Sequence, residues 1–455
     1  MTFLAKTLVP VTIAAIAIGL LGIPSAASDP PTVEPPAALL DSPTDHASSA
    51  ALSKAPKQCR YRGNDFYEVP PVDEFPKKLG ALIRCEARKI KGLKKASAFR
   101  IMYTSEAPDG SPRASTGLIF VPNKKAPKRG RHVVAWSHGT VGLGVSCAPS
   151  RALKKITPKG IGSFDWINSM LKRNWVVAAT DYIGLGTTGP NAGSPLYLVG
   201  KSGAIDTINS VRAARKLTTT KARKTFAVYG HSQGGQSSLF VGSVAPDYAP
   251  ELKLKGVAVA DPAAEVVSEV NQVWDQSIGW VIGPPVVLSW PAADSRLDPA
   301  EIVGNAGLAQ YQKLARECIG PAALKGLEDR LVFGSFFVKN PMNSPAWAKF
   351  AAEQVTPRVK AAPVFIGQNT ADGVVLANTI AKLQTEWCAA PRNKTKLKMN
   401  WVKEPNQGFL NSLTIHANAA AYQAPFVIKW IDKRFEGKKA PSSCGKKPPV
   451  RPAGG

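Results

Sequence analysis

The chain has 455 residues, of which 44% are hydrophobic, so it holds enough apolar material for a sizeable core. This length suggests two or three domains, or one large α/β domain with an insertion. Lysine and arginine outnumber aspartate and glutamate by 58 to 32, which gives a formal net charge of +26.

Nucleic acid is the first partner that such a charge suggests, but the basic residues are scattered, apart from clusters such as 88–95 and 124–131. No nucleic-acid motif accompanies them, so we expect no nucleic-acid partner. An anionic cell-envelope polymer or lipid surface is the better candidate. An equally good interpretation is that the charge only keeps the protein soluble.

Residues 1–28 have the pattern of a secretory signal peptide. Lys6 gives the positive start, residues 8–23 form an apolar run, and small residues at 25–28 offer a cleavage site. The alternative, an uncleaved membrane anchor, is disfavoured because the run is short and contains Pro10. No later stretch has the ~18 apolar residues of a spanning helix. We therefore expect a soluble, secreted protein, extracellular or associated with the cell wall.

Both ends of the remaining chain differ in composition from its middle. Residues 29–57 are rich in Pro, Ala and Ser and lack periodicity, which predicts a disordered leader. Residues 438–455 form a basic, Pro- and Gly-rich tail. Between these ends we expect a folded core in two parts, 58–264 and 358–437, with an insertion at 265–357.

Strands and helices alternate through the two core parts, which predicts a mainly parallel sheet covered by helices on both faces. Several of the candidate strands are continuous apolar runs, as expected of strands buried on both sides. The candidate strands are 116–121, 132–137, 175–180, 226–230, 256–260, 363–367 and 398–402. The candidate helices are 163–173, 204–217, 233–245, 376–387 and 417–434.

The insertion at 265–357 breaks this alternation and is rich in aromatic residues. One interpretation is a small second domain that packs its aromatic side chains inward. The other is a cap or lid whose aromatic side chains line an acyl pocket. We favour the cap, because an insertion between strands 256–260 and 363–367 emerges at the carboxyl edge of the sheet, where open α/β sheets place their sites.

Six cysteines fit an exported chain and allow up to three disulfides. None forms a Cys-x-x-Cys pair, so a zinc or redox motif is not expected. Six cysteines have 15 possible connectivities. We expect the pairs Cys59–Cys85, Cys147–Cys318 and Cys388–Cys444.

The motif that organises the chain is Gly-x-Ser-x-Gly at 230–234, between the candidate strand at 226–230 and the candidate helix at 233–245. Strand, tight turn and helix in this order define a nucleophile elbow, in which Ser232 sits on a strained turn that exposes its hydroxyl. Gly230 and Gly234 leave room for the turn, since a Cβ at either position would clash with the neighbouring strand or helix.

A serine hydroxyl needs a base, and this chain has five histidines. His46 lies in the leader, His132 and His138 bound a strand well before the serine, and His231 adjoins it, so its ring should point into the turn or the sheet. His416 remains, at an expected loop-to-helix junction. It also satisfies the order Ser, acid, His that this arrangement uses.

The acid should lie between Ser232 and His416, just past a strand. Asp372 follows the candidate strand 363–367 and is our choice. Asp261 is the rival, because it ends strand 256–260, although it precedes a proline. An aspartate beside a glycine is often only a turn former.

Stabilising an oxyanion requires preorganised N–H donors. One should be the backbone N–H of Gln233, directly after the nucleophile. The other should come from the loop after strand 132–137, where Gly139 and Thr140 are both candidates.

A second glycine-rich stretch, Gly184-x-Gly186-x-x-Gly189, matches a dinucleotide fingerprint. In that fingerprint the last glycine opens a helix, whereas Pro190 and further loop residues follow here. Asp206, at the spacing of the ribose-binding acid, falls inside a helical pattern. We therefore expect a loop at the rim of the sheet and no nucleotide cofactor.

Taken together, the motif blocks from about residue 66 to 437 resemble those of the secretory lipases, α/β-hydrolases that include the fungal lipase A enzymes and exported actinobacterial homologues. The blocks are His138-Gly139-Thr140, Cys147-Ala148-Pro149-Ser150, Asp181-Tyr182 with Gly184-Leu185-Gly186-Thr187, Tyr197-Leu198-Val199-Gly200, the elbow at 230–235, and Trp430 to Phe435. The resemblance implies an α/β-hydrolase fold, Ser232, Asp372 and His416 as nucleophile, acid and base, and a lid at the insertion.

These observations predict a monomeric carboxylic ester hydrolase that needs no metal or organic cofactor. Triacylglycerols or other medium- to long-chain esters are the leading substrates. An acyltransferase acting on envelope or wax lipids would use the same residues. A peptidase of this fold is less favoured, since no repeat array could form a gating propeller. A non-catalytic envelope-binding protein remains the alternative from another class.

Overall fold

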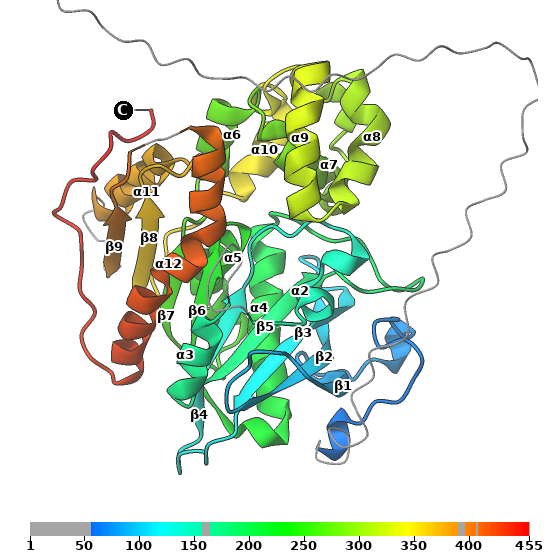
Figure 1. Cartoon of the computed structure of the whole chain (residues 1–455), viewed down its shortest axis with the longest axis vertical. Coiled ribbons are helices and arrows are strands. Elements are labelled where there is room, and N and C mark those ends of the chain that lie inside the picture. Colours follow the sequence, from blue (N-terminus) through cyan, green and yellow to red (C-terminus); the bar gives the residue numbers. More distant parts are fainter. Residues whose placement is uncertain (1–55, 157–163, 390–395, 406–407, 455) are drawn as a thin grey trace, which may run out of the picture. The chain divides into compact units, whose positions relative to one another are not determined.

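The computed structural model describes residues 56–156, 164–389, 396–405 and 408–454 (Figure 1). The predicted signal peptide and all but the last two residues of the predicted leader lie outside these ranges. Within them, no helix is both long enough and apolar enough to span a bilayer.

A nine-stranded sheet runs through the described part of the chain, in the order β1-β2-β3-β5-β4-β6-β7-β8-β9. Neighbours from β5 to β9 pair in parallel, and β1, β2, β3 and β5 pair antiparallel in that order. The mainly parallel α/β sheet is therefore confirmed. The strands are β1 (Leu82–Arg88), β2 (Ala96–Glu106), β3 (Pro112–Pro122), β4 (Arg131–Ser137), β5 (Val176–Ile183), β6 (Ala222–His231), β7 (Lys253–Ala260), β8 (Val364–Asn369) and β9 (Leu397–Val402).

Helices cover both faces of the sheet, because its central strands are apolar on both sides; all residues of β5 and β8 are buried. The α4, α5 and α11 helices pack into one apolar cluster, and α3 and α12 into the cluster on the opposite face (Figure 1). These helices are α3 (Trp166–Lys172), α4 (Gly200–Lys216), α5 (Gln233–Tyr248), α11 (Ala377–Ala389) and α12 (Phe409–Phe435), and the short α2 (Pro149–Ala152) precedes them.

Five further helices lie between β7 and β8, within the segment expected to be an insertion (Figure 1). They are α6 (Val266–Val273), α7 (Gly279–Ala293), α8 (Asn305–Arg316), α9 (Ile319–Phe333) and α10 (Pro345–Glu353). Their aromatic side chains form a core of their own, in which Trp280, Phe336 and Trp347 are almost completely buried.

The three expected disulfides all form: Cys59–Cys85, Cys147–Cys318 and Cys388–Cys444. The second closes a loop of 171 residues and joins the segment after β4 to the start of α9. It therefore ties the inserted helices to the core of the sheet.

Several sequence expectations need correction. The strands β1 and β2 were not expected, because their polar and charged residues hide the apolar pattern, as with Glu86, which is buried beside Arg100. The strand β8 runs on to Asn369, so the turn before Asp372 is shorter than expected. The helix expected at 163–173 begins at Trp166, and residue 163 lies outside the described ranges.

Candidate active site

Ser232 lies between the last residue of β6 and the first residue of α5, where the backbone must turn sharply from strand to helix. Its φ and ψ are 53° and −119°, which a non-glycine residue rarely adopts. Strain of this kind places the hydroxyl of a nucleophile elbow clear of the sheet edge.

Two glycines make this turn possible by their lack of side chains. A Cβ on Gly230 would lie 2.0 Å from the carbonyl oxygen of Gly234. A Cβ on Gly234 would lie 2.0 Å from the carbonyl oxygen of Ser137, at the end of β4. Both positions thus require glycine, for the reason that the sequence pattern predicts.

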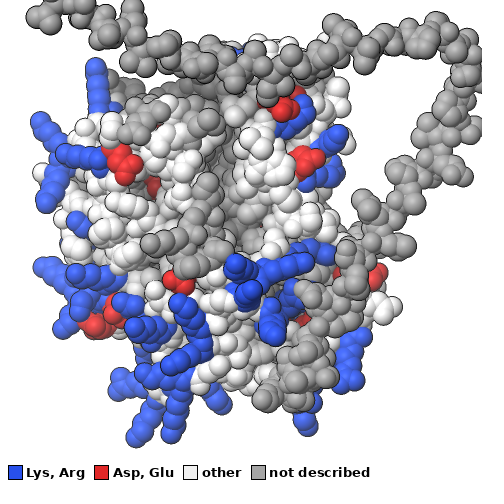
Figure 2. All heavy atoms as spheres, in the orientation of Figure 1, with Lys and Arg blue, Asp and Glu red and all other residues white. Residues whose placement is uncertain are grey.

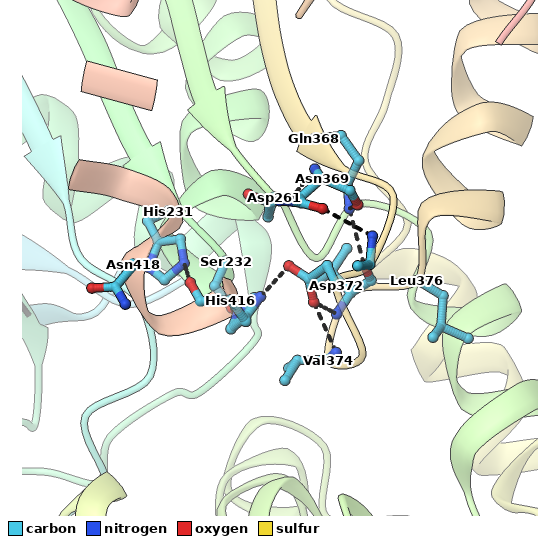
Figure 3. A network of polar contacts seen from close by, with 12 residues as sticks. His231, Ser232, Asp261, Gln368, Asn369, Asp372, Val374, Leu376, His416 and Asn418 are labelled. Atoms are coloured by element: carbon cyan, nitrogen blue, oxygen red, sulfur yellow. Dashed lines mark hydrogen bonds and ion pairs between the residues drawn. The ribbon is translucent and has the colours of Figure 1, made fainter. Parts of the chain in front are cut away.

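The structure brings together three side chains that are far apart in the sequence. The Oγ atom of Ser232 is 2.9 Å from Nε2 of His416, and Nδ1 of His416 is 2.7 Å from Oδ2 of Asp372 (Figure 3). All three residues are at most 9% exposed. Hydroxyl, imidazole and carboxylate therefore form a continuous hydrogen-bonded chain.

The position of His416 relative to its helix differs from the sequence expectation. It lies about two turns inside α12, which begins at Phe409, and not at a junction between loop and helix. The expected junction was wrong because the apolar pattern of this helix is interrupted by polar residues near its start.

Asp372 follows β8 in a tight turn that fixes the direction of its carboxylate. Its Oδ1 atom accepts hydrogen bonds from the N–H groups of Val374 and Val375, at 2.8 and 2.9 Å. This leaves Oδ2 for His416 (Figure 3). The turn-forming role and the interaction with the imidazole are thus both present in one carboxylate.

Asp261, the rival acid, lies next to this carboxylate without taking its place. It is almost completely buried, and its Oδ1 atom accepts a hydrogen bond from the backbone of Asn369 at 2.8 Å. Burial, reinforced by the charge of Asp372, raises the pKa of Asp261 well above its usual range. The protonated, uncharged form of Asp261 is therefore favoured.

His231 contacts the backbone of His416, and the sequence did not reveal this contact. Its Nε2 atom lies 2.9 Å from the backbone oxygen of His416, so the tautomer with a proton on Nε2 satisfies this contact (Figure 3). Burial, and then the nearby His416, lower the pKa of His231 to about 3, so the ring is neutral. The ring also fills the space beside Gly139, where a Cβ would come within 2.7 Å of it.

The expected oxyanion donors lie around Ser232. Gln233 is the first residue of α5, where backbone N–H groups lack partners within the helix. Thr140 lines the same cavity as Ser232 and Gln233, and its Oγ1 atom is 2.7 Å from the hydroxyl of Tyr197. Burial raises the pKa of Tyr197, so this phenol stays protonated.

A buried polar network holds the loop that carries Gly139 and Thr140. The Tyr182 hydroxyl donates to the backbone oxygen of His138 at 3.0 Å. The His138 ring lies 2.6 Å from the backbone oxygen of Gly139 and 3.3 Å from that of Asp181. The Asp181 carboxylate in turn accepts from the backbone of Ser150 at 2.9 Å. Two of the motif blocks, around 150 and 181, therefore position this loop.

A cavity of ≈ 110 Å³, open to solvent, starts at Ser232 and continues beneath the inserted helices. Its lining is almost entirely apolar and includes aromatic residues that the sequence suggested for an acyl pocket. Among these residues are Val270, Trp274, Ile282, Trp290, Phe337 and Trp347. The cap stays a prediction, and Trp347 belongs both to this lining and to the core of the inserted helices.

Among the described residues that line the cavity, Glu269 is the one carboxylate. Its Oε1 atom accepts a hydrogen bond from the backbone of Leu376 at 2.8 Å, close to the turn that holds Asp372. Burial raises the pKa of Glu269 to about 8. At neutral pH the cavity therefore contains little negative charge.

The second glycine-rich stretch lies in the loop between β5 and α4. Gly184, Gly186 and Gly189 all have positive φ, and the next helix begins only at Gly200. Asp206 is buried inside α4, where it accepts from the backbone of Ile183 at 2.8 Å. Both features differ from a dinucleotide fold, as the sequence predicts.

The secretory lipase family model matches residues 163–443. Lipase 1 of Candida albicans is 22% identical over 416 residues, which cover 84% of this chain and 82% of that protein. The secreted triacylglycerol lipase LIP5 of Malassezia globosa is 22% identical over 78% of this chain and 74% of its own. Among solved structures, Candida antarctica lipase A in its closed state has a TM-score of 0.64 at 17% identity, covering 85% of this chain and 89% of that one. This last likeness shows the α/β-hydrolase fold.

Proposed function

The chain belongs to the secretory lipase family, and this membership indicates a secreted lipase or esterase. We propose that Ser232, His416 and Asp372 carry out its ester hydrolysis. The observation that supports the proposal is their hydrogen-bonded chain, 2.9 and 2.7 Å long at its two contacts, at one end of an apolar cavity.

In the first half of the reaction, the Ser232 oxygen attacks the ester carbonyl carbon while its proton passes to Nε2 of His416. Asp372 keeps Nδ1 protonated and stabilises the imidazolium. The carbonyl oxygen becomes an oxyanion that accepts from the N–H group of Gln233 and from Gly139 or Thr140. Collapse of this intermediate breaks the ester C–O bond, and the alcohol leaves with the proton from Nε2.

The second half releases the acyl group from Ser232. Water gives a proton to Nε2 of His416 as its oxygen attacks the acyl carbon, and the same donors hold the oxyanion. The carboxylic acid departs and the serine oxygen regains its proton. Apart from the ester and the water, the groups that take part in these steps are side chains and backbone N–H groups of the chain.

The apolar cavity supports acyl esters of medium to long chain, including triacylglycerols, as substrates. We further propose that the enzyme is a monomer and that its charge of +26 attracts it to an anionic envelope or lipid surface. In that arrangement the enzyme acts outside the cell, and this attraction alone retains it at the wall.

The test is hydrolysis of p-nitrophenyl esters across a range of chain lengths by wild type and Ser232→Ala. We expect the variant to lose roughly 10³-fold or more of kcat, while the exposed Ser97→Ala control keeps its activity. A fluorophosphonate probe should label wild type and Ser97→Ala only. Full activity of Ser232→Ala would refute the mechanism, and products formed with an added alcohol would identify an acyltransferase.

A further inference from the structure

A basic groove lies at the far end of α12 from His416. Arg434 lies 18 positions after His416, which corresponds to about 27 Å along a helix. The groove is therefore distinct from the cavity at Ser232. Its basic lining residues are Lys398, Lys429, Lys433, Arg434, Lys438 and Lys439, from β9, α12 and the segment after α12.

Arg434 is the feature that sets this groove apart from an ordinary basic surface. It is only 4% exposed, and its Nη2 atom donates to the backbone oxygen of Lys439 at 3.1 Å. Its Nε and Nη1 atoms are buried and have no hydrogen-bond partner among the described residues. Burial lowers the pKa of Arg434, and no carboxylate opposes this effect. A buried guanidinium in this state is costly unless an acceptor reaches it.

The position of this guanidinium is fixed by packing. It lies 5.3 Å from the centre of the Trp430 ring, one turn earlier on α12. Both side chains fit against β7 because residue 256 is glycine; a Cβ there would come within 2.6 Å of Trp430 and 3.2 Å of Arg434. Arg434 is thus held in place before any ligand arrives, which lowers the entropic cost of binding.

The charge around the groove is strongly positive. Lys429, Lys433, Lys438 and Lys439 are exposed, and Figure 2 shows Lys and Arg outnumbering Asp and Glu over the lower part of the face where α12 ends. Glu436 pairs with Lys433 at 3.0 Å. The groove therefore attracts anions, and Arg434 within it has donors that are not yet hydrogen-bonded to any described residue.

We propose that this groove is a binding site for the phosphate groups of a phosphodiester polymer of the cell envelope. The guanidinium keeps two donors unpartnered in the described part of the chain, Nε–H and Nη1–H, on different edges, each able to donate to a phosphate oxygen, and the lysines of the groove contribute point charges. A polymer suits the site because cationic side chains of α12 and of the segment after α12 line the same groove. This deepens the proposed attraction to an anionic envelope, but it does not depend on the ester hydrolysis.

The test measures binding of purified wild-type protein to poly(glycerol phosphate) by calorimetry. The principal variant is Lys429→Gln/Lys433→Gln, which removes two exposed charges. The matched control is Lys77→Gln/Lys78→Gln, which removes two exposed charges elsewhere and leaves the same net charge. We expect the groove variant to lose about 10-fold in affinity and the control less than about 2-fold.

Arg434→Gln provides the second variant, and we expect it to weaken binding at least as much. Hydrolysis of a soluble ester by all variants should match wild type, which shows that they fold and separates this test from that of the active site. Equal losses in the two lysine pairs, or equal binding of poly-glutamate, would show that only net charge matters and would overturn the proposal. Binding to phosphatidylglycerol vesicles without binding to the polymer would also overturn it, in favour of a lipid surface.

Discussion

Two buried arginines differ in how many of their side-chain donors have hydrogen-bond partners. Arg131, at the start of β4, is 5% exposed, and each of its side-chain nitrogens has a partner: Nε donates to Asn174, Nη1 to Thr220 and Nη2 to Pro122, at 2.8 to 3.1 Å. Arg434 is 4% exposed, and two of its nitrogens have no partner among the described residues. Burial lowers the pKa of both. Equal burial therefore does not imply an equal role.

Arg131 is a group whose hydrogen bonds are all made within the chain, whereas Arg434 keeps donors that a ligand could use. Arg131 joins the end of β3 to the turns before β5 and β6 and so serves the fold. The proposed catalytic residues resemble it, because both ring nitrogens and the backbone oxygen of His416 are bonded within the chain. A fully bonded network holds reacting groups in a fixed geometry, whereas an open donor in a basic groove indicates binding from outside.

The largest expected effect concerns the acid in that internal network. Asp372→Asn should lower kcat by about 10³- to 10⁴-fold, because an amide cannot hold the imidazole in the required tautomer or stabilise its charge. The isosteric Asp261→Asn variant is the control. Because Asp261 favours the uncharged form, we expect it to keep kcat within roughly 10-fold of wild type. Measurement of kcat on a p-nitrophenyl ester checks both, and the reverse order of effects would move the acid to Asp261.

The next effect concerns the space that the elbow needs. Gly234→Ala would place a Cβ 2.0 Å from the Ser137 oxygen, so we expect a loss of roughly 3 kcal/mol or more in the free energy of unfolding, together with loss of activity. Gly320→Ala, in α9, meets nothing within 4 Å and should be neutral or slightly stabilising. Urea unfolding of the two variants compares them; a Gly234→Ala protein as stable as wild type would mean that the elbow relaxes.

The parallel half of the fold was predictable from the sequence, and the antiparallel half was not. Strands such as β5 and β8 are buried on both faces and appear as apolar runs. In β1 only Cys85 and Glu86 are buried, and the glutamate is stabilised by Arg100 from β2. That pairing is a tertiary contact, which no local pattern records.

The site divides in the same way. Ser232 follows from a local motif, and His416 and Asp372 follow from the limited supply of histidines and from the order of strands. The contacts of Tyr197 with Thr140 and of Glu269 with Leu376 link residues 57 and 107 positions apart. They depend on how the inserted helices and loops pack, so no local sequence pattern indicates them.

A smaller effect tests the arginine comparison directly. Arg131→Met leaves several buried carbonyl groups without a donor, so we expect it to lower the free energy of unfolding by roughly 2–4 kcal/mol. Arg434→Met removes a buried charge whose donors are mostly unmet and keeps the packing on Trp430, so its cost should stay within about 1 kcal/mol. Urea unfolding without phosphate measures both values. Equal losses would show that Arg434 is satisfied in solution and would weaken the case for a ligand.

The smallest expected effect concerns Glu269. It accepts one internal hydrogen bond, yet burial raises its pKa well above the ordinary value. The folded protein keeps its proton up to about pH 8, whereas an unfolded chain releases it near 4.5. The folded state therefore binds more protons between these values, so the free energy of unfolding should fall as the pH rises from about 4.5 to 8. Glu269→Gln keeps an oxygen for the Leu376 N–H and has no proton to lose, so it should be roughly 1–3 kcal/mol more stable than wild type above pH 8 and equal to it near pH 4.5. Urea unfolding of both proteins at the two pH values measures the difference, and a gap that does not change with pH would place the ionised Glu269 in contact with solvent.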